Sequence, residues 1–401
     1  MKRFTPALCL VFVFALLAVA MPNSSFAQKT KPVEATSGRV IGESPSVPGQ
    51  FIVKFKSGTQ RANRQAELRS IGGAVISRVE SLDSDVVEFA ALKQSPSPQA
   101  RAAVLDALKK NPNIEYAEPN YIYSIQYTPN DPNLNQQWAW NKIQAPRAWD
   151  VTRGSSSVVI AVVDTGIQAN HPDLDAKVLA GYDYVDNDSN PADGNGHGTH
   201  VAGTAAAETN NGTGVAGTCP DCKVMPVRVL DNNGSGSLDN IARGITYAAD
   251  NGAKVINLSL GGTSGTSSLE SAINYAWNKG VFIACAAGNS NTTSMFYPAG
   301  YGNCMAVAST TSSDARSSFS NYGNWVDIAA PGSDIYSTFT GSSYKSMNGT
   351  SMASPHVAGL AGLLASQGLT NSQIRSRLCS TADQISGTGS AWSCGRINAA
   401  S

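Results

Sequence analysis

The sequence predicts an α/β protein: a parallel sheet with helices on both faces, preceded by a smaller α+β unit. From residue 127 onward, short apolar segments alternate with longer helical ones, a pattern typical of parallel strands that are buried on both sides. The roughly 275 residues of this part are enough for one large domain. Polar, catalytically capable side chains follow several of its strands, where open α/β sheets place their sites.

The elements of the larger part follow from these apolar segments and from the stop signals around them. We expect strands at Val158–Val163, Lys223–Val229, Val255–Leu258, Val281–Ala286, Met305–Thr310 and Asp327–Ala330. We expect helices at His197–Ala207, Leu238–Asn251, Ser268–Lys279 and Thr350–Gln367.

The N-terminal segment has the features of a secretory signal. Lys2 and Arg3 precede an apolar run that ends at Ala20, and small residues up to Ala27 offer a cleavage site. A membrane anchor is the alternative, but the run is short for a span of about 20 residues. We therefore predict a signal over residues 1–27, followed by a linker over residues 28–49.

Residues 50–126 read as a small independent unit. The expected order is strand, helix, two strands, helix and strand, which is ferredoxin-like. Its elements are expected at Phe51–Lys56, Gln60–Ser70, Ala74–Val79, Asp85–Ala90, Gln99–Lys110 and Ile114–Ile125.

Charge separates the two parts of the chain. Residues 1–126 carry a net charge of +5 and residues 127–401 a net charge of −5. Opposite charges favour their association, and salt screens it. The balanced total gives no basic patch for nucleic acid, and nothing argues for a membrane after processing.

Three motifs supply an acid, a base and a hydroxyl. Asp164 closes an apolar strand, His197 opens a helix in Asn195-Gly196-His197-Gly198-Thr199-His200, and Ser351 opens another in Gly349-Thr350-Ser351-Met352-Ala353. A serine hydroxyl becomes a nucleophile when a base takes its proton and an acid orients that base. Taken singly, each motif also has a structural reading: a strand end, a solvent-exposed turn and a helix cap.

Asn289 follows the apolar run that starts at Val281 and is a fourth candidate. A fixed side-chain amide can stabilise the oxyanion that forms when a carbonyl is attacked. An asparagine-rich turn is the alternative.

The order Asp, His, Ser along the chain and the amino-acid sequences of these motifs resemble those of the subtilisin-like serine proteases, the subtilases. The resemblance covers residues 127–401. It implies that Asn289 and the backbone N–H of Ser351 bind the oxyanion, and that residues 50–126 are an inhibitory and folding prosegment released near Gln126-Tyr127. It also implies a monomer that binds extended peptides along two segments and a pocket wall, formed by Gly234, Ser235, Gly236, Ser259, Leu260, Gly261 and Gly288.

Phe296 falls where these proteases have the base of their primary pocket. If its ring points inward, large aromatic side chains of the substrate should fit poorly. A core or surface position is the alternative.

The resemblance further implies structural Ca²⁺, which prefers oxygen ligands. A first site would use side chains of Asp131, Asp173 and Asn211 and carbonyls of Glu208, Thr213 and Val215. A second would lie in the acidic loop with Asp183, Asp186 and Asp188, although Ala192 replaces a longer polar residue there. An ordinary turn and a solvated acidic loop are the alternatives.

Six cysteines remain outside the signal, an even number typical of disulfides in an exported chain. Fifteen pairings are formally possible. We expect the local ones, Cys219 with Cys222, Cys285 with Cys304, and Cys379 with Cys394. A zinc site of His197, His200 and the first cysteine pair is the alternative, but it would occupy the proposed base.

Two functions from different classes follow. The first is a secreted or periplasmic serine endopeptidase that acts on protein and peptide substrates and is made as a zymogen. The second is a catalytically silent binding scaffold of the same fold.

Overall fold

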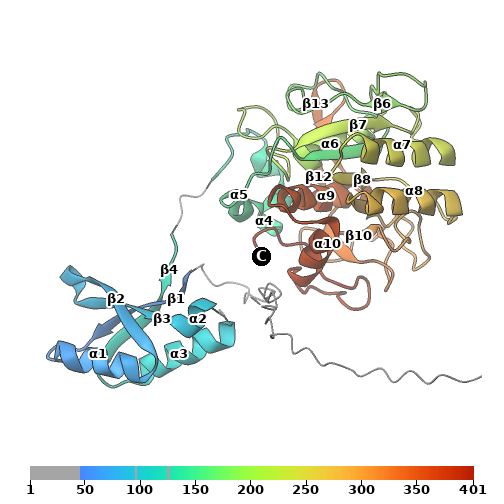
Figure 1. The fold of residues 1–401 in the computed structure, drawn as a ribbon. Helices are drawn as coiled ribbons and strands as arrows, with labels where there is room; N and C mark the ends of the chain where they lie inside the picture. The colour runs from blue at the N-terminus through green and yellow to red at the C-terminus, as the bar shows by residue number, and fades with distance from the viewer. Residues whose placement is uncertain (1–45, 95–96, 124–126) are drawn as a thin grey trace, which may run out of the picture. The chain divides into compact units, whose positions relative to one another are not determined.

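The computed structural model describes residues 46–401 apart from 95–96 and 124–126 (Figure 1). The described chain forms two compact units, residues 46–120 and 121–401. The predicted signal and residues 28–45 of the predicted linker lie outside the described residues. Within the described part of the chain, no helix is long and apolar enough to cross a membrane.

The smaller unit is a four-stranded sheet with the strand order β2-β3-β1-β4. This is the predicted ferredoxin-like arrangement, and its core includes Phe51, Phe89 and Leu108. The first strand begins at Ser46. Residues 46–49 therefore belong to the sheet, whereas the sequence predicted that they belong to the linker. The elements are β1 (Ser46–Phe55), α1 (Arg61–Ser70), β2 (Gly73–Val79), η1 (Glu80–Leu82), β3 (Ser84–Phe89), α2 (Ala90–Gln94), α3 (Pro98–Lys110) and β4 (Ile114–Tyr121).

The larger unit is built on a seven-stranded sheet with the order β11-β10-β9-β8-β5-β7-β6, in which every pair is parallel. Its strands are β5 (Val159–Asp164), β6 (Tyr182–Asp183), β7 (Lys223–Arg228), β8 (Val255–Leu258), β9 (Phe282–Ala286), β10 (Met305–Thr310) and β11 (Ile328–Pro331), and β12 (Ile335–Phe339) pairs with β13 (Ser343–Met347) in a separate hairpin. Its helices are η2 (Leu134–Gln136), α4 (Trp138–Lys142), α5 (Ala145–Trp149), α6 (His197–Ala206), α7 (Leu238–Asp250), α8 (Ser267–Asn278), α9 (Thr350–Ser366) and α10 (Asn371–Ser380).

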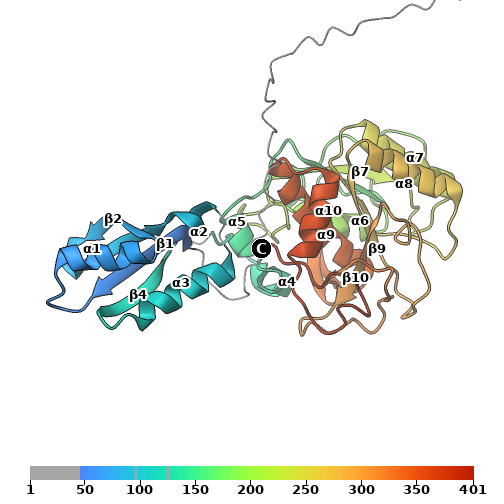
Figure 2. The ribbon, with the colours of Figure 1, turned by 60° about the horizontal axis from the view of Figure 1, so that its bottom comes forward.

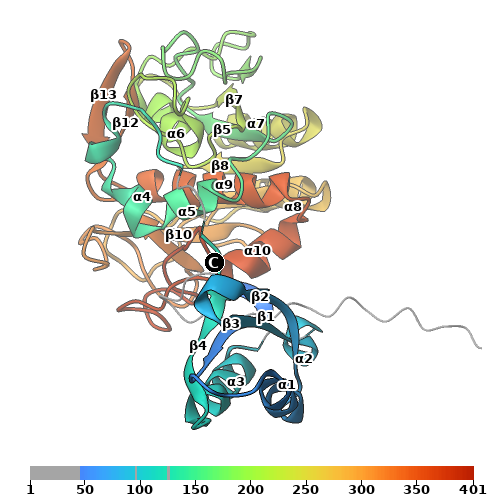
Figure 3. The ribbon, with the colours of Figure 1, turned by 90° about the vertical axis from the view of Figure 1, so that its left-hand side faces the viewer.

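Helices cover both faces of this sheet, as predicted. Along β5, Ile160 and Val162 point into one core, with α6 and α9, whereas Ala161 and Val163 point into the other, with α7 and α8. Figure 2 shows α7 and α8 together, with α9 and α10 on the other side of the sheet, and Figure 3 shows α4 and α5 next to α9. The central strands β5, β8, β9 and β10 are apolar over most of their length because both faces are buried.

Several short or polar elements of the larger unit were not predicted from the sequence: η2, α4, α5, β6, β12, β13 and α10. The β12–β13 hairpin is rich in serine, threonine and tyrosine, and only part of one strand is buried, so it carries no apolar run. Helix α10 begins at a capping box formed by Thr370 and Gln373, a signal that the sequence does contain.

Candidate active site

Asp164 lies at the carboxyl end of β5 and is fully buried. Its Oδ1 accepts the backbone N–H of Thr165 at 2.8 Å and contacts Nδ1 of His197 at 2.7 Å. Since a carboxylate only accepts hydrogen bonds, Nδ1 of the imidazole carries the proton. The other ring nitrogen, Nε2, is therefore left as the basic atom.

His197 is the first residue of α6. Glycine at position 198 lets this helix approach β5 closely, because a Cβ atom there would lie 2.1 Å from the carbonyl oxygen of Gly166. Burial lowers the pKa of His197, but the charge and hydrogen bond of Asp164, together with the charge of Asp193, raise it by more. The net result is a pKa above the ordinary histidine value, which suits a base that must accept a proton during reaction.

Ser351 is the second residue of α9. Its hydroxyl donates to the carbonyl of Ser259 at 3.2 Å, and the hydroxyl of Ser259 donates back to the carbonyl of Ser351 at 2.8 Å. Among the described residues, no hydrogen bond joins Ser351 to His197. Such contacts are often long in an unliganded site and form when substrate binds.

Ser351 and His197 face the same cleft, which has a volume of about 710 Å³. Asn289 also lines it, and Asp164 lies behind His197. The seven residues predicted to bind substrate line it as well: Gly234, Ser235, Gly236, Ser259, Leu260, Gly261 and Gly288. The structure thus gathers segments far apart in the chain around one groove.

The side chain of Asn289 is held by its carbonyl oxygen. Thr350 donates to that oxygen from its backbone N–H at 2.8 Å and from its hydroxyl at 3.0 Å. A Cβ atom placed on Gly349 would lie 3.5 Å from both Nδ2 of Asn289 and the backbone nitrogen of Ser351. Two hydrogen-bond donors, the amide of Asn289 and the backbone N–H of Ser351, therefore both lie close to Gly349, and such donors are the groups that an oxyanion site needs.

Phe296 lines the cleft between two glycine-containing segments. A Cβ atom on Gly261 would lie 2.5 Å from its ring, and one on Gly288 would lie 3.0 Å from it. The ring thus packs against both backbones and reduces the space between them.

The residues predicted for the first calcium site do cluster. Asp173 is fully buried, and its carboxylate accepts hydrogen bonds from the side chain of Asn211 at 2.9 Å and from the backbone of Val215 at 2.8 Å. Asp131, also buried, accepts from the backbone of Asn210 at 2.9 Å. Burial raises the pKa of Asp173 to about 7, and the charges of Asp131 and Glu208 add to this.

Among the described residues, neither Asp131 nor Asp173 has a cationic partner within ion-pair distance. Two buried carboxylates without a counter-charge are costly, and oxygen donors of this kind suit a hard cation. The residues therefore fit Ca²⁺, although no group of three or more acidic, histidine or cysteine side chains with metal-binding geometry occurs in the described part of the chain.

The acidic loop does not fit a second calcium ion. The guanidinium of Arg228 contacts Asp183 at 2.5 Å and Asp186 at 2.6 Å, so the chain supplies its own cation. Asp183 also accepts from the backbone of Val185 at 2.7 Å, and Asp188 accepts from Asn190 at 2.8 Å. Arg228 could not be recognised as the partner of this loop from local sequence, because it lies on β7, 45 positions from Asp183.

The structure contains disulfides at the three expected pairings, Cys219–Cys222, Cys285–Cys304 and Cys379–Cys394. The zinc alternative is therefore wrong, because the sulfurs of the first pair are bonded to each other. His200 is also committed elsewhere: its Nε2 lies 3.0 Å from the carbonyl of Ile335 and 2.9 Å from that of Lys345.

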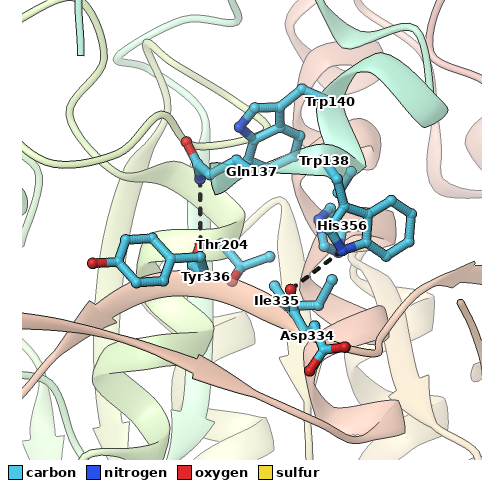
Figure 4. Close-up of a pocket in the computed structure, with 9 residues that line it drawn as sticks. Gln137, Trp138, Trp140, Thr204, Asp334, Ile335, Tyr336 and His356 are labelled. Carbon is cyan, nitrogen blue, oxygen red and sulfur yellow. Dashed lines mark hydrogen bonds between the residues drawn. The ribbon is translucent and has the colours of Figure 1, made fainter. Parts of the chain in front are cut away.

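A second, much smaller cavity lies against α4 and β12 (Figure 4). Around it, the side-chain amide of Gln137 donates to the carbonyl of Tyr336 at 3.4 Å, and the indole of Trp138 donates to that of Asp334 at 3.2 Å. Its volume of about 10 Å³ has room for one water molecule and not for a substrate.

Two supporting residues, Thr350 and Asp193, were not predicted from the sequence, and Ser259 was predicted only as a substrate-binding residue. Thr350 anchors Asn289, Ser259 binds the segment around Ser351, and Asp193 accepts the backbone N–H of Thr199 in the first turn of the helix that carries His197. Only Asp193 left a sequence signal, an acidic residue just before a helix start. The other two contacts depend on how distant segments meet.

A parallel α/β unit with a carboxylate, an imidazole and a serine at one cleft defines the class of serine hydrolases. Residues 155–396 match the Subtilase family, and residues 39–120 match the fervidolysin N-terminal prodomain. The chain therefore belongs to the subtilase family: it is a subtilisin-like serine protease with an N-terminal prodomain.

Named relatives agree with this assignment. Thermitase from Thermoactinomyces vulgaris is 62% identical over 274 residues, which are 68% of this chain and 98% of thermitase. A thermophilic serine proteinase from Bacillus sp. (strain AK1) is 52% identical over 353 residues, covering 88% of this chain and 86% of that protein. Among solved structures, a protease from Pseudoalteromonas arctica PAMC 21717 is 38% identical, with a TM-score of 0.64 over 68% of this chain and 98% of its own.

Proposed function

We propose that this protein is a secreted, calcium-stabilised serine endopeptidase, made as a self-processing zymogen, in which Asp164, His197 and Ser351 form the catalytic triad. The observation that carries the proposal is the 2.7 Å contact between Asp164 and His197 beside a cleft that Ser351 also lines. A silent scaffold would have no need to retain an acid, a base, a hydroxyl and an amide donor around one groove.

In the first half of the reaction, Oγ of Ser351 attacks the peptide carbonyl carbon while Nε2 of His197 takes its proton. The carbonyl π electrons move to oxygen, and the resulting oxyanion accepts hydrogen bonds from Nδ2 of Asn289 and the backbone N–H of Ser351. When the intermediate collapses, the C–N bond breaks and the leaving amine takes the proton from His197.

In the second half, water attacks the acyl ester on Ser351 and His197 takes a proton from that water. The C–O bond to Ser351 then breaks, and the proton returns to its oxygen. Asp164 remains ionised throughout, because its role is to orient the imidazole and stabilise its charged form.

The substrate is an extended segment of a protein or peptide. The backbones of residues 234–236 and 259–261 line the cleft and would pair with that of the substrate, which gives affinity without requiring one sequence. The enzyme acts as a monomer.

We infer four domains: a signal over residues 1–27, a linker, a prosegment that ends at residue 126 and a catalytic domain over residues 127–401. In support of this boundary, the backbone N–H of Tyr127 donates to Asp150 at 2.5 Å and its ring packs on Trp149, so residue 127 already belongs to the larger unit. The prosegment inhibits the enzyme until it is cleaved off, and export then delivers the active form outside the cell or to a periplasm.

Ca²⁺ would be held by Asp131, Asp173, Asn211 and the carbonyls of Glu208, Thr213 and Val215. Its role is structural: it supplies the positive charge that the two buried carboxylates lack.

The test is Ser351→Ala in the full-length chain, assayed with a casein substrate and by N-terminal sequencing. We expect hydrolysis to fall by about 10⁶-fold and the prosegment to stay attached. The matched control is Ser268→Ala, because Ser268 is also the second residue of its helix but is exposed and does not line the cleft. Unchanged hydrolysis by Ser351→Ala would refute the mechanism, and an inactive wild type would favour the scaffold.

A further inference from the structure

Asp193 accepts five hydrogen bonds although it lies outside the predicted triad. Its Oδ1 accepts from the hydroxyl of Thr165 at 2.9 Å and from the backbones of Asn195 at 3.0 Å and Gly196 at 2.8 Å. Its Oδ2 accepts from the backbone of Thr199 at 2.9 Å and from its hydroxyl at 2.6 Å. Both carboxylate oxygens thus accept hydrogen bonds, from the residue that follows β5, from the loop before α6 and from the first turn of α6.

These bonds secure the start of α6, the helix that carries His197. The residue that caps this helix is Gly196, which has no side chain, so the first N–H groups need other acceptors. The N–H of Gly198 donates to Thr165 at 2.9 Å, and that of Thr199 donates to Asp193. The helix start is therefore fixed by a carboxylate that precedes it.

The same carboxylate reaches the strand that carries the acid. Thr165 follows Asp164 directly, and its hydroxyl donates to Asp193 while accepting from the N–H of Gly198. Through this single hydroxyl, the end of β5 and the beginning of α6 are tied together. A shift of either element would change the contact between Asp164 and His197.

We propose that Asp193 is a positioning residue of the protease: through Thr165 and the first turn of α6, it sets the relative placement of Asp164 and His197. The inference rests on the proposed triad and adds to it a residue that does not touch substrate. A misplacement of about 1 Å between reacting groups can cost 100-fold in rate, so a residue with this role should affect turnover.

The charge of Asp193 acts on the same histidine and supplies an independent readout. The groups whose charges act on His197 are Asp164 on β5 and Asp193 on the preceding loop. The nearby His200 on α6 is neutral near pH 7, because burial lowers its pKa to about 4. Both carboxylates raise the pKa of His197, so removing one of them should lower it.

The decisive variant is Asp193→Asn, assayed as mature enzyme with a peptide substrate across pH. We expect kcat to fall about tenfold, equivalent to ~1.4 kcal/mol, with KM nearly unchanged. Asparagine presents an N–H₂ group to Thr199, where the carboxylate accepted two hydrogen bonds. Because this group cannot accept them, the start of α6 and therefore His197 should be held less firmly. Because His197 must be neutral to act as a base, we also expect the acidic limb of kcat/KM to move to lower pH.

Thr165→Val separates position from charge. It removes the bridging hydroxyl and leaves the carboxylate, so kcat should fall while the acidic limb stays in place. Asp193→Glu keeps the negative charge but places it at a different distance. Compared with Asp193→Asn, it should return the acidic limb of kcat/KM to its wild-type pH without restoring the full kcat. Asp250→Asn is the matched control, since it removes an exposed carboxylate at the far end of α7 and should change neither property.

The outcomes discriminate clearly. If Asp193→Asn lowers the melting temperature but leaves kcat and the pH profile of the folded enzyme as in the wild type, the residue is only structural and the inference is wrong. If Ser351→Ala keeps full activity, the triad itself is wrong, and the two failures are thereby distinguishable.

Discussion

Thr350 binds the carbonyl oxygen of Asn289 twice, through its backbone N–H and its hydroxyl. An amide whose oxygen is held in this way has its N–H₂ group directed the other way, and both this group and the backbone nitrogen of Ser351 lie close to Gly349. The hydroxyl of Thr350 also accepts the N–H of Gly288 at 3.0 Å. The geometry of the proposed oxyanion site therefore depends on a threonine beside the proposed nucleophile as well as on the asparagine.

This relationship predicts two graded losses. Asn289→Ala removes a donor that acts mainly on the transition state, so kcat should fall by about 10²–10³ with little change in KM. Thr350→Val keeps the backbone bond and removes only the hydroxyl, so we expect a loss of about tenfold. Steady-state kinetics on a peptide substrate measures both, and Asn303→Ala, outside the cleft, serves as the control. A Thr350 variant as impaired as the Asn289 variant would argue against this division of roles.

Phe296 predicts a preference for small side chains before the scissile bond, because its ring occupies space between Gly261 and Gly288. Phe296→Gly should raise kcat/KM for cleavage after phenylalanine by at least tenfold relative to cleavage after alanine. The measurement is a cleavage profile on a peptide library. Met295→Ala is the control, since this exposed neighbour does not line the cleft. A wild-type enzyme that already prefers phenylalanine or tyrosine would contradict the prediction.

Calcium binding should show one site and not two. Titration calorimetry on the processed enzyme, inhibited by a serine-directed phosphonate, should give a stoichiometry of one. Asp173→Asn should abolish binding, whereas Asp186→Asn should leave it intact because Arg228 neutralises that loop. With calcium at 100 times its dissociation constant, the gain in unfolding free energy should be ~2.7 kcal/mol, and chelation should remove it. Two sites of similar affinity would show that Arg228 does not replace the ion.

The sequence predicted six of the seven strands of the large sheet and named the candidates His197, Ser351 and Asn289, which the structure brings to one cleft; it did not predict β6, which has only two residues. Strands β8 and β10 begin and end where the apolar runs predicted them. Each catalytic candidate stands at the end of an apolar strand or the start of a helix, so one-dimensional patterns were enough to locate it. The three cysteine pairs could likewise be proposed from short separations along the chain.

The supporting contacts could not be predicted in this way. The pairs Arg228 with Asp183 and Ser259 with Ser351 join residues that are 45 and 92 positions apart. No local pattern encodes such a meeting, because it depends on the register and twist of the whole sheet. The polar β12–β13 hairpin was missed for a related reason: it is stabilised by contacts to α6, such as the hydroxyl of Thr338 donating to the carbonyl of Thr199 at 2.7 Å, and not by an apolar face.

His356 predicts how stability depends on pH. Its ring is fully buried in α9, with Nδ1 2.9 Å from the carbonyl of Met352 and the ring against Trp140, and burial lowers its pKa to about 4. Between about pH 4 and 6.5 the unfolded chain therefore binds a proton that the folded chain does not. The stability contribution is complete above about pH 6.5 and is lost as the pH falls toward 4, at up to ~1.4 kcal/mol per pH unit.

The measurement is urea unfolding of inhibited mature enzyme at a series of pH values. His356→Leu should reduce the slope of unfolding free energy against pH in this window by up to ~1.4 kcal/mol per pH unit, which corresponds to one proton. This change in slope is expected whatever the substitution does to absolute stability. His197 shifts in the opposite direction, since its pKa is raised, so its contribution to stability is complete below about pH 6.5 and is lost only at higher pH. A variant at that position should therefore leave the slope between about pH 4 and 6.5 unchanged and alter it only above about pH 6.5. If the His356 variant and the wild type have equal slopes, the imidazole is already charged in the folded protein. The statement that α9 packs around a neutral His356 ring would then be wrong.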